Sequence, residues 1–155
     1  MKSFIEKYLK DSAIPAKKVL YKANNIVFSE KDIGDGMYLI ESGQVKILKK
    51  IPYINKEVDL ATLGSNENFG ELSLILGRAR ACDVVALTDC TLWFLDEKTF
   101  KEAITKSPEF SLMIMQGLAN KLGRMNEKHK EMISYLREFT ERLEDFSSFL
   151  HSFVP

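Results

Sequence analysis

Short β-rich runs follow one another between Lys17 and Asp96, and they constrain the fold more than any other feature of the sequence. Each run is rich in Val, Ile, Leu and aromatic residues, and turn-forming pairs such as Asn24-Asn25 and Ser42-Gly43 separate them. The runs are 19–21, 26–28, 37–40, 45–48, 58–63, 84–86 and 91–95. Turn signals at such short intervals are typical of antiparallel sheets. The pattern predicts a mainly β fold with α-helices, an eight-stranded antiparallel jelly-roll barrel (double-stranded β-helix) with a helical turn inserted at Gly70.

The apolar period changes from 2 to 3.6 after Leu95, which indicates helices. Residues 96–104 predict a short helix, and Ser107 followed by Pro108 predicts the start of a long one. A helix of some 40 residues would be about 60 Å long. A short amphipathic helix is also expected near the N-terminus, over residues 2–10. We therefore expect a single domain over 1–155, with an N-terminal helix in 1–16, a barrel in 17–96, and C-terminal helices in 97–155 that include a long dimerisation helix over about 108–150.

The second half of the long helix carries a heptad pattern. Its positions alternate in spacing between three and four residues: Leu122, Met125, His129, Met132, Leu136, Phe139, Leu143, Phe146, Leu150 and Phe153. Except for His129, this seam is apolar, so it needs a partner. The pattern favours a homodimer with a coiled coil, while the bulky phenylalanines leave a larger bundle or a docking surface for an effector protein open.

Composition excludes several classes of function. Lysine plus arginine and aspartate plus glutamate both total 22, so no global positive field suggests nucleic-acid binding. No run approaches the roughly 20 apolar residues of a membrane span, and two cysteines without metal-motif spacing indicate reduced thiols in a cytoplasm. The two histidines, His129 and His151, lie in the predicted long helix, which argues against a metal-dependent enzyme with a histidine site in the barrel.

The stretch from Asn68 to Val84 has the composition of an anion site. Gly70 and Glu71 precede a predicted helical turn, and Arg80 follows the glutamate by nine residues. Free backbone N–H groups and a planar guanidinium both suit a phosphate. A carboxylate beside such a site either holds the arginine or accepts hydrogen bonds from ligand hydroxyls.

This stretch resembles the phosphate-binding cassette of cyclic nucleotide-binding domains, the family of protein kinase A regulatory subunits and bacterial catabolite activators. The resemblance also rests on 34–47 (GDGMYLIESGQVKI) and on 60–64 (LATLG), and it covers residues 17–130. It implies that Arg80 pairs with the cyclic phosphate, that Glu71 accepts the ribose 2′-hydroxyl, and that cassette amides bind the phosphate. The implied cassette contacts are Gly70, Glu71, Leu72, Ser73, Arg80, Ala81 and Cys82.

The resemblance implies further contacts to the base. Ile47, Leu60 and Ala61 match positions of the pocket wall, where core packing explains them equally well. Met125 and Asn126 of the long helix match the residues that cap the purine, although both could simply belong to the seam and its flank. Ala81 stands where a hydroxyl residue often accompanies guanine, so the resemblance favours cAMP over cGMP.

Three cassette positions depart from the family pattern. Ala79 stands where proline is common, Cys82 replaces a small residue, and Asp83 replaces the usual threonine or serine. An acid pointing into an anion site would oppose binding, whereas strand alternation can place Asp83 on the face opposite Arg80. Arg78 is expected to be solvated and not a second phosphate ligand.

These features predict a non-catalytic, cytoplasmic cyclic-nucleotide sensor that signals through its long helix in a homodimer. No metal or catalytic residue is expected, and no direct DNA binding, because no helix-turn-helix segment follows the long helix in this sequence. The alternatives are a degenerate domain that serves as a protein-interaction or oligomerisation module, or a truncated relative of a transcription regulator.

Overall fold

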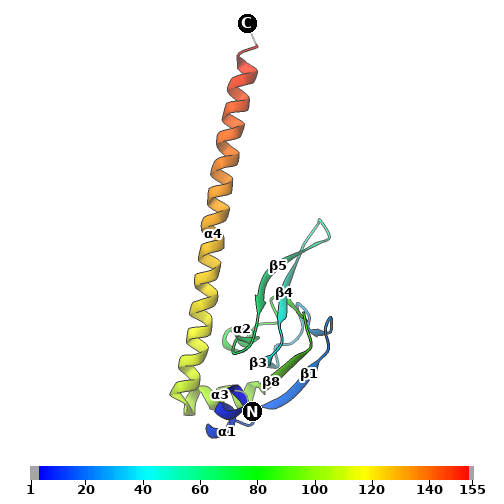
Figure 1. The fold of residues 1–155 in the computed structure, drawn as a ribbon, viewed down its shortest axis with the longest axis vertical. Helices are drawn as coiled ribbons and strands as arrows, with labels where there is room; N and C mark the ends of the chain where they lie inside the picture. The colour runs from blue at the N-terminus through cyan, green and yellow to red at the C-terminus, as the bar shows by residue number, and fades with distance from the viewer. Residues whose placement is uncertain (1–3, 154–155) are drawn as a thin grey trace. The chain divides into compact units, whose positions relative to one another are not determined.

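Eight strands and four helices make up the part of the chain that the computed structural model describes, residues 4–153 (Figure 1). The strands are β1 Lys17–Tyr21, β2 Ile26–Phe28, β3 Gly36–Ser42, β4 Val45–Ile51, β5 Lys56–Leu63, β6 Asn68–Phe69, β7 Asp83–Ala86 and β8 Cys90–Asp96. The helices are α1 Phe4–Asp11, α2 Glu71–Leu76, α3 Glu97–Lys106 and α4 Pro108–His151. The described residues fall into two compact units, one ending at Ile114 and the other beginning at Met115. The organisation of residues 1–155 as a single domain stays a prediction.

The strands form two antiparallel sheets, as the turn spacing predicted. One sheet has the order β1-β8-β3-β6 and the other β2-β7-β4-β5. Sequence neighbours such as β3 and β4 lie in different sheets, whereas β8 returns from the end of the strand region to lie between β1 and β3. The predicted jelly-roll class is therefore confirmed, and each predicted run lies within a strand.

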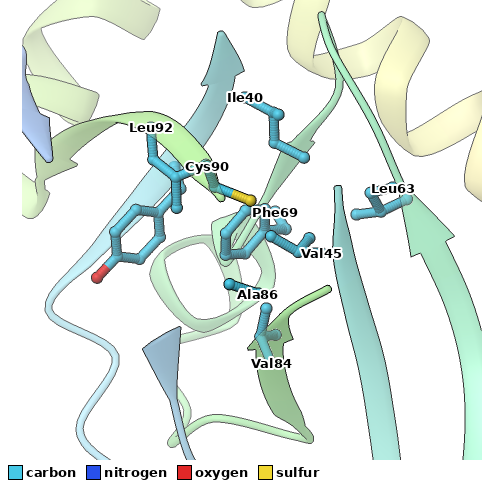
Figure 2. Packing of buried hydrophobic residues seen from close by; sticks show 9 residues of the cluster. Ile40, Val45, Leu63, Phe69, Val84, Ala86, Cys90 and Leu92 are labelled. Atoms are coloured by element: carbon cyan, nitrogen blue, oxygen red, sulfur yellow. The ribbon is translucent and has the colours of Figure 1, made fainter. Parts of the chain in front are cut away.

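The core lies between the two sheets (Figure 2). Ile40, Phe69 and Leu92 contribute from one sheet. Val45, Leu63, Val84 and Ala86 contribute from the other. Burying such side chains contributes roughly 1.5–3 kcal/mol each, which holds the sheets face to face. This packing fixes the position of the loop and helix that connect β6 to β7.

Capping residues separate α3 from its neighbours. The Asp96 carboxylate accepts a hydrogen bond from the backbone N–H of Thr99 at 2.8 Å, and this bond lowers the pKa of Asp96. At the other end, the Ser107 hydroxyl accepts from the N–H of Phe110 at 3.2 Å, so Ser107 begins α4 as the sequence predicted. Phe100 of α3 packs edge-on against Phe110 of α4, at 6.2 Å between ring centroids.

The N-terminal helix begins at Phe4 in the described residues, and the part of its prediction over residues 2–3 lies outside them. Ile5 and Leu9 are buried, as expected for the apolar face of an amphipathic helix. The Tyr8 hydroxyl lies 3.3 Å from that of Ser107, which joins α1 to the start of α4.

Helix α4 runs for 44 residues without interruption, as Figure 1 shows, and is about 66 Å long. In the chain by itself, all ten seam positions from Leu122 to Phe153 are exposed, and the nine apolar ones keep 49–69% of their surface. Among residues 4–153, none of the helices is long and apolar enough to span a membrane.

Candidate functional site

The connection between β6 and β7 contains the cassette, residues 70–82. β6 has two residues and pairs with β3, with Phe69 opposite Tyr38. Gly70, at φ 84° and ψ −3°, turns the chain into α2, and Gly77, at φ 61°, ends that helix. The chain then returns through Arg78–Cys82 to β7. The order of Gly-Glu, short helix, arginine and strand is thus the predicted one.

Gly70 cannot carry a side chain without disturbing its surroundings. Its φ is in the left-handed region that L-residues rarely adopt. A Cβ atom here would lie 2.9 Å from Nη1 of Arg80 and 3.2 Å from the carbonyl oxygen of Gly36. The missing side chain therefore makes room for the arginine as well as for the turn.

The Arg80 side chain is almost completely buried, and 3% of the residue's surface is exposed. Its Nη1 donates to the carbonyl of Gly70 at 2.9 Å, and its Nη2 donates to the carbonyl of Gly36 at 2.7 Å. The backbone is held as well, because Arg80 N–H donates to Asp32 and Lys31 N–H donates to Arg80, both at 2.9 Å. Strand β3 and the loop after β2 therefore fix both the main chain and the guanidinium.

The charge of Arg80 is only partly compensated inside the protein. The carboxylate of Asp35 lies 3.3 Å from Nη2, but its side chain is 71% exposed and water screens it. The ring of Phe28 lies 4.1 Å from the guanidinium carbon. Among the described residues, Nε of Arg80 is buried and has no hydrogen-bond partner. A buried cation with an unused N–H is a strong attractor for an anion.

The other cassette residues divide by exposure. Glu71 and Ser73 are buried in the first turn of α2, at 1% and 7% exposure. Leu72 is half exposed and Ala81 is exposed, so both lie at the protein surface. The structure thus places Glu71, the predicted ribose acceptor, in the same turn that Gly70 starts.

Two of the three residues of the predicted pocket wall, Ile47 and Ala61, pack against the core. Ile47 on β4 lies opposite Ala61 on β5 and Val84 on β7. Ile47, Ala61 and Cys82 are partly buried and pack against the core cluster, and burial raises the pKa of the Cys82 thiol. Leu60 is 43% exposed. The structure brings Ile47, Ala61 and Cys82 together, and packing accounts for their apolar character.

Asp83 has partners of its own. Its carboxylate accepts a hydrogen bond from the N–H of Glu30 at 2.6 Å and lies 3.5 Å from Nζ of Lys50. Its neighbours Cys82 and Val84 pack on the core. The acid that replaces the family's hydroxyl residue therefore holds the loop after β2 and pairs with a lysine.

Arg78 differs from Arg80 in its exposure. It is exposed and lines an open cavity of about 310 Å³. The lining residues are Ile33, Gly34, Ser73, Leu74, Gly77, Arg78, Ala79 and Glu97, so Arg80 and Glu71 do not contribute. This arrangement agrees with the prediction that Arg78 is solvated.

Comparison with known proteins decides the family. The sequence model described as "Cyclic nucleotide-binding domain" matches residues 18–107, more than half of the chain. The chain belongs to the cyclic nucleotide-binding domain family. It is 36% identical over 123 residues to the human "Cyclic nucleotide-gated channel beta-1", a match that covers 77% of this chain and 10% of the channel subunit.

Two further relatives of this cyclic nucleotide-binding domain are bacterial. A "CRP-like cAMP-activated global transcriptional regulator" of Mycobacterium tuberculosis is 30% identical over 113 residues, which covers 73% of this chain and half of the regulator. The crystal structure of the Thermus thermophilus catabolite activator protein has a TM-score of 0.66 and 26% identity, covering 84% of this chain and 59% of that one. The chain thus spans between a tenth and three fifths of the length of these proteins.

Met125 and Asn126 lie in the second compact unit, whereas the cassette lies in the first. Both side chains are exposed on α4. Their contact with a base stays a prediction.

Sequence reasoning missed two side chains that surround Arg80. Asp35 stands within the stretch that carries the family resemblance, so its carboxylate was a usable signal. Phe28 gave no signal, because an aromatic residue in a short strand is most simply a core residue.

Proposed function

We propose that this protein is a non-catalytic cyclic-nucleotide sensor and that its ligand is cAMP. The observation that carries the proposal is the state of Arg80, a buried cation with a buried, unpartnered Nε–H and a screened counter-ion. The cyclic phosphate of a nucleotide supplies both the negative charge and the acceptor oxygens that this group lacks. Membership of the cyclic nucleotide-binding domain family supports the same ligand class.

In this proposal each part of the nucleotide has its own partners. Arg80 and the amides of Gly70, Leu72 and Ala81 bind the phosphate, and the buried carboxylate of Glu71 accepts the ribose 2′-hydroxyl, with Ser73 and Cys82 beside them. Ile47, Leu60 and Ala61 form the wall beside the base. Met125 and Asn126 of α4 are the candidates that the family resemblance gives for the base, because an amide can donate to and accept from the edge of adenine.

The choice of cAMP over cGMP rests on Ala81. A threonine or serine here would offer a hydroxyl to the amino group of guanine, whereas alanine offers none. A desolvated amino group without a partner costs roughly 1–3 kcal/mol, so we expect cAMP to bind about ten- to a hundredfold more tightly. The relative from Mycobacterium tuberculosis is described as cAMP-activated, which supports this choice.

The proposed output passes through α4. Ligand binding at the cassette would shift α3, which follows β8, and the start of α4, which packs on α3 through Phe110. The exposed seam would pass the change to a second copy of the chain. An effector protein would then read the state of the dimer.

Calorimetric titration of the purified protein with cAMP, cGMP and a cyclic dinucleotide tests the proposal. We expect cAMP to bind most tightly, and Arg80→Ala to weaken binding by at least about 2 kcal/mol, roughly thirtyfold, because a buried phosphate loses its charge-assisted partner. Arg78→Ala is the matched control, since this arginine is exposed and lines a cavity to which Arg80 does not contribute.

Absence of binding at millimolar concentrations would overturn the cAMP assignment. A degenerate domain that acts as an oligomerisation module would then be the better explanation, because the exposed seam does not depend on the ligand. An equal loss for both arginine variants would instead show that the cassette residues are wrongly assigned.

A further inference from the structure

Phe28, the last residue of β2, contacts the guanidinium of Arg80 with the face of its ring. The ring centroid lies 4.1 Å from Cζ of Arg80, which is within the range of a cation–π interaction. We propose that Phe28 is a positioning residue for the ligand phosphate, because its ring holds Arg80 in the orientation that the phosphate meets. This inference rests on the proposed function and adds a residue to it.

The ring itself is firmly placed. β2 pairs with β7, and Phe28 lies opposite Val84 of the core. The ring also packs against Phe69, at 5.9 Å between centroids, and against Tyr38, at 6.2 Å. Phe28 therefore offers a fixed aromatic surface at the edge of the core, and the guanidinium lies against it.

The contact should be stronger here than at a protein surface. Arg80 is almost fully buried, so little water competes with the ring for its charge. The carbonyls of Gly70 and Gly36 accept from Nη1 and Nη2. The ring and the carbonyls together define one orientation of the guanidinium, in which Nε–H is buried and has no hydrogen-bond partner among the described residues.

An interaction that is present before and after ligand binding contributes to affinity through preorganisation. A free arginine side chain has several rotatable bonds, and ordering such a side chain on binding costs free energy. With Phe28 in place, we expect Arg80 to be ordered before the ligand binds. Without the ring, the Arg80 side chain would populate other rotamers. The apparent affinity would then fall in proportion to the fraction of molecules that keep the binding-competent rotamer.

If Phe28 were only a core residue, its loss would affect stability and not the position of Arg80. Phe94 is the control for this alternative. Phe94 belongs to the same aromatic group and packs on Tyr38 at 5.1 Å. Among the described residues, Phe28 is the one whose aromatic ring lies against the guanidinium of Arg80. Loss of Phe94 should therefore reduce stability without disturbing the arginine.

The test compares cAMP affinity, by calorimetry, for wild type, Phe28→Leu, Phe28→Tyr and Phe94→Leu, each verified as folded by circular dichroism. We expect Phe28→Leu to lower the affinity about three- to tenfold. Phe28→Tyr, which keeps the ring face, and Phe94→Leu should stay within about twofold of wild type. In an Arg80→Ala background, Phe28→Leu should have no further effect, because the ring then has no cation to hold.

The inference is wrong if Phe28→Leu retains wild-type affinity for cAMP. It is also wrong if Phe94→Leu or Phe28→Tyr lowers the affinity as much as Phe28→Leu does. These results differ from a failure of the proposed function, in which the wild-type protein itself does not bind cAMP.

Discussion

At the scale of single residues, Gly70 and Arg80 depend on each other. The glycine carbonyl accepts a hydrogen bond from the guanidinium, and the absence of a glycine side chain leaves space for it. The other end of the guanidinium reaches the carbonyl of Gly36 on β3. Gly70 and Arg80, which the sequence motif assigns to the ligand site, are therefore also structural partners. Substitutions can separate their role in ligand binding from their role in the fold.

Gly70→Ala and Gly77→Ala form a matched pair. Both glycines have positive φ, so each alanine should destabilise the protein by roughly 1–2 kcal/mol. A Cβ at Gly77 would meet no atom within 4 Å, whereas one at Gly70 would press on Nη1 of Arg80. Urea unfolding should show a loss for both variants, and calorimetry should show weaker cAMP binding for Gly70→Ala alone. Equal cAMP affinities for the two variants would contradict the role given to Gly70.

Ala81→Thr should raise the affinity for cGMP and change that for cAMP little. The added hydroxyl would accept a hydrogen bond from the amino group of guanine and remove most of a penalty of roughly 1–3 kcal/mol. Because Ala81 is exposed, the larger side chain should fit without repacking the core. Titration of both nucleotides into both proteins measures the change. An unchanged ratio of affinities would show that this position does not select the base.

The sequence predicted the cassette better than its surroundings. Gly70, Glu71 and Arg80 lie close in sequence, so their spacing could be recognised directly. Asp35 and Gly36 contact Arg80 from 45 and 44 residues away, and Phe28 reaches it from β2. Those contacts depend on which strands are neighbours in the two sheets, and hydrophobic patterns do not specify strand order.

At the scale of elements, short strands were the hardest to predict. β6 has only two residues, too few for an alternating pattern, and it was missed as a strand. Its pairing with β3 nevertheless stacks Phe69 on Tyr38, at 5.0 Å between ring centroids. Tyr38 also contacts Phe28 and Phe94, so one aromatic group joins β2, β3, β6 and β8.

The burial of Tyr38 predicts a loss of stability in alkali. Burial, with a smaller contribution from a hydrogen bond with Tyr21, raises the pKa of the Tyr38 phenol above its ordinary value near 10. The unfolded chain therefore loses this proton at a lower pH than the folded protein. The stabilisation is fully present below about pH 10 and declines as the pH rises above it, by up to about 1.4 kcal/mol per pH unit.

Urea unfolding between about pH 9 and pH 11 checks this expectation. Tyr38→Phe should flatten the decline, because the variant has no proton to lose at this position. Tyr53→Phe is the control, since it removes a phenol that is fully exposed. Identical slopes for wild type and Tyr38→Phe would mean that the phenol is not held neutral by the fold.

At the scale of the whole molecule, α4 extends from the compact unit that contains the cassette into a unit of its own. Phe110 and Ile114 are buried near its start, and from Leu122 to Phe153 the apolar side chains are exposed. Nine apolar side chains, each about half exposed on one seam, are a large unfavourable surface in water. The heptad spacing of this seam is that of helices that pack side by side, so a second α4 is the partner that fits it.

Replacing Leu136 and Leu143 together by Glu should convert the proposed dimer into monomers. Both residues lie on the seam, so the double variant would place four carboxylates between two helices, where burying a charge without a partner is costly. Ser134→Glu with Ser148→Glu adds the same charge at exposed positions on the opposite face of the heptad, and this control should leave the dimer intact. Light scattering at micromolar concentration gives the mass of each protein, and circular dichroism reports whether the strands remain folded. A wild-type mass of one chain would contradict the proposed dimer, and dissociation of the control would show that the seam is not its specific interface. Either result would mean that the seam does not transmit ligand binding to a second subunit.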